Sequence, residues 1–146
     1  MIDITQLAAG TAAFGLIIAY VLYTQIKKIK IDNPTVADIT QQIQDGAMAF
    51  LYAEYRILAV FVAVVFALLF VNNGEMTAIA FLAGAVTSVV AGFCGMRAAT
   101  SANGRTAMAA ATGGQPAALE VSFNGGAVMG LSVGGLGLLG ISTMVI

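Results

Sequence analysis

The sequence predicts an all-α integral membrane protein with four transmembrane helices. Four long apolar segments contain no charged residue, and three of them exceed the roughly 20 residues that span a ~30 Å hydrocarbon layer. These segments are Ile4–Ile26, Ile57–Gly74, Met76–Met96 and Val121–Ile146. Of the 146 residues, 60% are hydrophobic and only 9% are charged, which excludes a soluble domain of this size.

The six basic residues predict how the helices are oriented. They fall into two alternate connections of the chain, between the first and second segments and between the third and fourth. They are Lys27, Lys28, Lys30, Arg56, Arg97 and Arg105. Cytoplasmic loops are enriched in Lys and Arg, so both connections are predicted to face the cytoplasm. The amino and carboxyl termini then lie on the non-cytoplasmic side of a multi-pass protein in the cell (inner) membrane.

The first two helices are predicted at about residues 4–30 and 34–71. Asn33 and Pro34 are typical of a helix start, with Asn as the N-cap and Pro in the first helical position. A helix from Pro34 to Val71 would be about 57 Å long at ~1.5 Å per residue. Since that exceeds the bilayer, its first turns are expected to project into the cytosol.

The third and fourth helices are predicted at about residues 76–111 and 121–146. The turn Asn72-Asn73-Gly74-Glu75 precedes the third helix, which can continue past Arg97 through the alanine-rich stretch Ala98–Ala111. Gly113-Gly114-Gln115-Pro116 should then end it.

Small residues at four-residue steps predict the packing faces of these two helices. Gly126, Gly130 and Gly134 form two overlapping GxxxG units, and Gly84, Ser88 and Gly92 form a similar ladder. In lipid, small side chains let helix backbones approach closely, so these six residues are predicted to pack against other helices. Such faces also indicate more helical neighbours than this chain alone provides.

No residue is predicted to be catalytic, to bind a cofactor or to hold a metal. The sequence has no histidine and a single cysteine, Cys94, and its net charge of −1 argues against nucleic acid as a partner. Asp45, Glu54 and Arg56 are interpreted as a solvated set at the membrane surface. Gly125-Gly126 at the expected start of the fourth helix could cradle a phosphate, although no GxxxxGK motif supports it.

Three stretches carry a family resemblance: IQDGAMAFLYAEYRI at 43–57, FLAGAVTSVVAGFCGMRAATSANGRT at 81–106 and FNGGAVMGLSVGGLGLLG at 123–140. In this order they resemble the amino-terminal region of membrane-integral inorganic pyrophosphatases, the ion pumps energised by pyrophosphate. The resemblance implies a homodimeric enzyme of about sixteen helices that hydrolyses magnesium pyrophosphate and drives H⁺ or Na⁺ outward.

What the resemblance implies for this chain is a supporting role. Residues 1–146 would be a single membrane domain corresponding to the first four helices of the pump, in the outer ring around its core. The magnesium-binding and pumping residues belong to later helices, so the chain alone is expected to bind no Mg²⁺ and to be inactive. Its partners would be the lipid bilayer and the remaining helices of the pump, and pyrophosphate would be the substrate of the whole enzyme.

Two alternatives stay open from the residues alone. One is a small transporter that works as an oligomer, which normally needs an acidic residue within the membrane; the segment Ile4–Ile26 has none. The other is an accessory membrane subunit that binds a partner through its glycine-rich helix faces.

Overall fold

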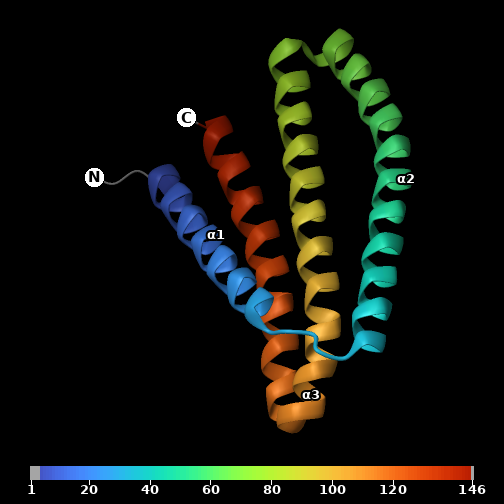
Figure 1. Cartoon of the computed structure of the whole chain (residues 1–146). Helices are drawn as coiled ribbons and strands as arrows, with labels where there is room; N and C mark the ends of the chain where they lie inside the picture. Colours follow the sequence, from blue (N-terminus) through green and yellow to red (C-terminus); the bar gives the residue numbers. More distant parts are fainter. Residues whose placement is uncertain (1–3, 146) are drawn as a thin grey trace.

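The computed structural model describes residues 4–145, which form three α-helices joined by short connections (Figure 1). The helices are α1 (Ile4–Lys28), α2 (Pro34–Asn73) and α3 (Glu75–Val145). Each is long and apolar enough to cross a membrane. The predicted all-α membrane class is therefore confirmed.

The start of α2 is confirmed in atomic detail. Asn33 is the N-cap, and its Oδ1 accepts hydrogen bonds from the backbone N–H groups of Thr35 at 2.9 Å and Val36 at 3.3 Å. Pro34 follows in the first turn, where its missing N–H would have no helical partner. The result is one helix of 40 residues, roughly 60 Å long at ~1.5 Å per residue.

α3 is a helical hairpin with its bend at Gly114. Gly114 has φ +70° and ψ −165°, a conformation outside the helical region that glycine adopts without a steric penalty. We name residues 75–113 the first leg and residues 115–145 the second leg. They run antiparallel, because contacting pairs such as Gly125 with Ala102 and Gly140 with Thr87 lie at nearly equal distances along the chain from Gly114.

The structure thus has three helices where the sequence predicted four. The expected non-helical linker over 112–120 is helical apart from Gly114, because a single residue with positive φ suffices to reverse the chain. Pro116 lies near the start of the second leg, where its ring and its missing N–H are tolerated. The alanine-rich end of the first leg therefore continues to the bend.

α3 is the centre of the fold. Within residues 4–145, α1 and α2 each pack against α3 and do not contact each other. Figure 1 shows the start of α1, the α2–α3 turn and the end of α3 at one end of the molecule. The α1–α2 loop and the bend of α3 lie at the other end, and the bend reaches beyond that loop.

Candidate functional site

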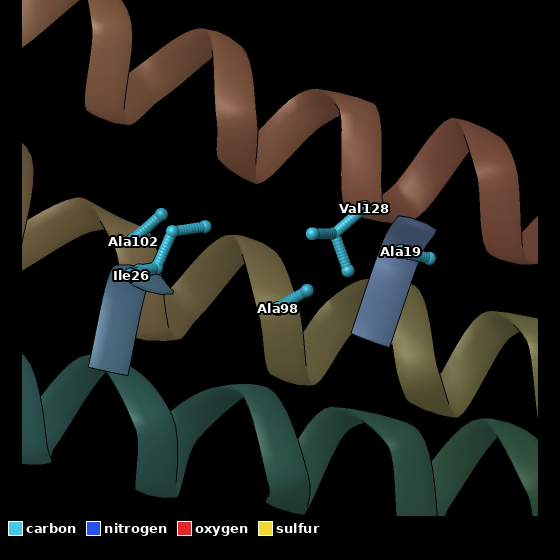
Figure 2. Close-up of a cluster of buried hydrophobic side chains, with 5 residues drawn as sticks. All are labelled: Ala19, Ile26, Ala98, Ala102 and Val128. Atoms are coloured by element: carbon cyan, nitrogen blue, oxygen red, sulfur yellow. The ribbon is translucent and has the colours of Figure 1, made fainter. Parts of the chain in front are cut away.

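The contact between α1 and both legs of α3 contains a cluster of small, buried side chains (Figure 2). Ala19 and Ile26 come from α1, Ala98 and Ala102 from the first leg, and Val128 from the second leg. Ile26, the largest fully buried residue, is only 1% exposed. Alanines at such a crossing let the helices approach closely, since no long side chain separates the backbones.

Next to this cluster, Arg105 of the first leg forms hydrogen bonds that hold the end of α1. Its Nε donates to the carbonyl oxygen of Ile29 at 3.1 Å, just after the last turn of α1. Its Nη1 donates to the carbonyl oxygen of Ser101 at 2.7 Å and to the Ser101 hydroxyl at 3.0 Å. A cation beside the last carbonyls of a helix also interacts favourably with the helix dipole. Arg105 therefore stabilises the packing of α1 on α3, in addition to any effect of its charge on the membrane topology.

α2 is attached to the first leg at two levels. Gly104 is buried against Thr40, whose side chain occupies the space that a β-carbon at position 104 would need. Further along, the Tyr55 hydroxyl donates to the carbonyl oxygen of Val89 at 2.8 Å. The same hydroxyl lies 3.4 Å from where a β-carbon at Gly92 would be, so Tyr55 crosses the first leg at a glycine.

The predicted packing residues lie at the edges of this structure. Gly84, Ser88 and Gly92 line an open groove of about 580 Å³ between the two legs, opposite Gly137 and Gly140. On the second leg, a β-carbon added at any of the three predicted glycines would meet no atom within 4 Å. Those residues, Gly126, Gly130 and Gly134, are exposed. Their role in packing stays a prediction about helices outside this chain.

Close packing inside the chain uses a different set of glycines. A β-carbon would come within 3.0 Å of another side chain at five glycines: Gly95, Gly104, Gly113, Gly125 and Gly135. Two of these belong to a row of buried residues on the second leg that we name the seam. The seam consists of Val121, Gly125, Val128, Ser132, Gly135 and Ser142. Its steps of four, three, four and three residues, followed by one of seven, follow the seven-residue repeat of a left-handed helix pair, and this spacing could have been read from the sequence.

The charged residues between positions 4 and 145 form no recognisable reaction centre. Asp45 is exposed on α2 and accepts a hydrogen bond from Gln41 of the same helix at 2.9 Å, while Glu54 and Arg56 are also exposed. Over residues 4–145, no three acidic or cysteine side chains come together as a metal site would require. The suggestion of a phosphate cradle at Gly125-Gly126 is wrong, because the second leg has already made several turns before reaching them and offers no helix end there.

Three long apolar helices around a small-residue contact define a multi-pass integral membrane protein. Within that class, the chain belongs to the inorganic H⁺ pyrophosphatase family, whose model matches residues 13–146.

Several curated relatives are pumps. A K⁺-insensitive pyrophosphate-energized proton pump of Pyrobaculum aerophilum is 38% identical over 148 aligned residues, which are 97% of this chain and 20% of the relative. A protein of the same description from Methanosarcina mazei is 44% identical over 117 residues, 78% of this chain and 17% of the relative. A K⁺-stimulated pyrophosphate-energized sodium pump of Thermotoga maritima is 45% identical over 105 residues, 71% of this chain and 14% of the relative. The chain thus spans a fifth or less of the length of these relatives.

Proposed function

We propose that these residues are the amino-terminal part of a pyrophosphate-energised H⁺ or Na⁺ pump and serve as scaffold for its catalytic core. The observation that carries this proposal is the continuous match to pumps across nearly the whole chain, together with the small share of each pump that is matched. Hydrolysis of pyrophosphate and ion translocation would then be activities of the complete protein.

The structure contributes the reason for a scaffold role. The acidic residues that it describes are all exposed, and no cluster of them fits Mg²⁺, so we assign no catalytic step to this chain. What residues 4–145 do provide is an arrangement of helices held by small-residue contacts and by the hydrogen bonds of Arg105 and Tyr55. We propose that Mg²⁺, as the family resemblance implies, is held by other helices of the pump, which works as a homodimer.

We further propose four membrane crossings, with both legs of α3 spanning the bilayer. This is supported by the antiparallel legs and by the absence of Lys and Arg from the α2–α3 turn, whereas Lys27, Lys28 and Lys30 flank the α1–α2 loop. The start of α1 and the end of α3 would then face outward. In a chain with Cys94→Ser, a cysteine at Asn73 should react with a membrane-impermeant maleimide in intact cells. A cysteine at Lys30 or Gln115 should react only after permeabilisation, and the opposite pattern would reverse the topology.

The remaining helices of the pump are the proposed partners of the exposed glycine face formed by Gly126, Gly130 and Gly134. Many other apolar side chains on this chain are also exposed, including Phe14, Phe61 and Phe123. In a membrane such surfaces meet either lipid or another helix, and small residues such as these glycines favour contact with another helix. If the chain were instead an accessory membrane subunit, it would bind its partner through the same face. Identifying the proteins that co-purify with it from native membranes distinguishes a part of a pump from an accessory subunit.

A chimera tests the proposed function. This chain replaces the matching region of the Pyrobaculum aerophilum pump, and pyrophosphate-driven proton uptake is measured in inverted vesicles. We expect uptake to be retained in the chimera and absent when either portion is expressed alone. Hydrolysis of magnesium pyrophosphate by the 146 residues alone, above a mock purification, would show that the scaffold assignment is wrong.

A further inference from the structure

A second open groove, of about 390 Å³, lies between α1 and both legs of α3. Apolar residues such as Leu16 and Val128 line part of it, and aromatic rings line another part. Two cations, Lys27 of α1 and Arg97 of the first leg, complete the wall, and no acidic residue lines it. The groove therefore combines a long apolar surface with positive charge, at the place where the apolar segment of α1 ends.

Neither cation is neutralised within residues 4–145. No hydrogen bond or ion pair of the Lys27 or Arg97 side chain occurs there, in contrast to Arg105, whose guanidinium makes three hydrogen bonds. Each cation instead lies over an aromatic ring: Lys27 Nζ is 5.6 Å from the ring centroid of Tyr23, and Arg97 Cζ is 6.0 Å from that of Phe93. A cation–π contact positions a charge and leaves its N–H groups free for an anion.

Ser132 adds an independent polar feature to the same groove. It is 7% exposed and lines the groove, and its hydroxyl takes part in none of the hydrogen bonds found in the described chain. Other buried hydroxyls behave differently: Thr40 and Ser142 donate to the carbonyl oxygen four residues earlier, at 2.6 and 2.7 Å. The Ser132 hydroxyl is thus a donor without a protein acceptor that is accessible from the groove, because every fully buried side-chain oxygen or nitrogen found in the described residues has a partner.

We propose that this groove is a binding site for an anionic phospholipid. The lipid belongs to the leaflet that faces the Lys- and Arg-rich connections of the chain. The phosphate lies between Lys27 and Arg97, the Ser132 hydroxyl donates to an oxygen of the glycerol ester region, and an acyl chain follows the apolar wall past Leu16. Basic pockets between transmembrane helices bind anionic headgroups, and the cytoplasmic leaflet is rich in such lipids. A soluble anion would use the cations but would leave the apolar wall uncovered.

Lipid titration with matched variants tests the charges. The protein is purified from its native membrane together with any sequence that continues it and any bound partner, and is placed in phosphatidylcholine nanodiscs. Phosphatidylglycerol is then added, and the bound lipid is measured by native mass spectrometry. Lys27→Gln with Arg97→Gln should weaken binding about thirty-fold, from the typical contribution of one basic residue near a charged surface taken twice. The control, Lys28→Gln with Lys30→Gln, removes the same charge from residues that do not line the groove and should stay within about twofold. Equal losses in the two variants would overturn the proposal.

Two further measurements separate the lipid from other occupants. A benzophenone side chain replacing Tyr20, which lines the groove and is 70% exposed, should give a lipid adduct on illumination. Adducts to protein instead would mean that a helix fills the groove and would overturn the proposal, as would displacement of phosphatidylglycerol by millimolar inorganic phosphate. This cross-linking keeps both cations, so it decides the question even if the charge variants fail to fold. It also does not depend on pump activity.

Discussion

The two faces of the second leg of α3 use the same residue, glycine, for different purposes. On the seam, Gly125 and Gly135 are buried, and a β-carbon there would lie 2.7 Å from Ala102 Cβ and 2.9 Å from Leu16, respectively. On the opposite side, Gly126 and Gly130 have nothing within 4 Å of the same position. Glycine on the seam is required by a neighbour inside the chain, whereas the GxxxG face is open. A GxxxG pattern therefore indicates that a helix can be approached closely, and the fold decides whether the neighbour belongs to the same chain.

The largest effect should come from filling the seam. Gly125→Leu places a branched side chain against Ala102, which has no rotamer to change, so the two legs must separate. Overpacking of this kind typically costs about 3 kcal/mol. Unfolding of the chain in mixed micelles of increasing SDS content measures it. Gly126→Leu, one residue away on the open face, is the control and should cause no loss of stability, because it meets no neighbour and leucine has the higher helix propensity.

Arg105→Gln should have the next largest effect, because it removes hydrogen bonds to the backbone at the end of α1 and to Ser101. Hydrogen bonds to charged groups contribute about 1.5 kcal/mol or more to stability. Faster hydrogen exchange at the end of α1, with α2 unchanged, is the expected signature. Arg56→Gln, which changes an exposed side chain, is the matched control. Equal increases in hydrogen exchange in the two variants would contradict the structural role of Arg105.

Gly114→Ala should destabilise the chain by at least about 1 kcal/mol, because φ +70° with ψ −165° is a conformation that essentially only glycine adopts. Its expected result is a more open bend and a looser seam, measured as a lower midpoint in the same SDS titration. Gly46→Ala is a useful contrast. That glycine lies inside α2 with open space around it, and alanine there should raise the midpoint through its helix propensity.

The smallest loss of stability in the isolated chain is expected for Gly130→Leu: it should cause none, because the position is open and leucine has a higher helix propensity than glycine. In the chimeric pump, however, the same change should prevent close approach of another helix and reduce the amount of assembled protein. Size-exclusion chromatography of the chimera measures the yield. Normal assembly with leucine at position 130 would mean that the open face is covered by lipid.

Much of the fold could be predicted from the sequence because lipid imposes strong constraints. The length and apolarity of the segments predicted membrane-spanning helices, and Asn33-Pro34 predicted the start of α2, which its capping hydrogen bonds confirm. The single-residue bend could not be predicted in the same way. Gly113-Gly114-Gln115-Pro116 is equally typical of a long linker and of one glycine with positive φ followed by a proline in a new first turn.

The site was harder to predict because packing depends on register. Gly126, Gly130 and Gly134 were singled out as a regular ladder, but which face turns inward depends on the antiparallel pairing with residues such as Ala102. The seam does have a signal of its own, the alternation of three and four residues through Val121, Gly125 and Val128. The groove beside Lys27 and Arg97 has none, since those residues lie far apart in the sequence and meet only through the fold.

The bend at Gly114 also fixes the rotational phase of one leg relative to the other. A connection of one residue has no slack to absorb an insertion, and each residue of an α-helix advances by about 100° around its axis. One extra amino acid beside Gly114 would therefore swing Gly125 out of the seam and turn a different side of the helix toward α1. The single residue at the bend therefore determines which face of the second leg packs against the first leg and α1.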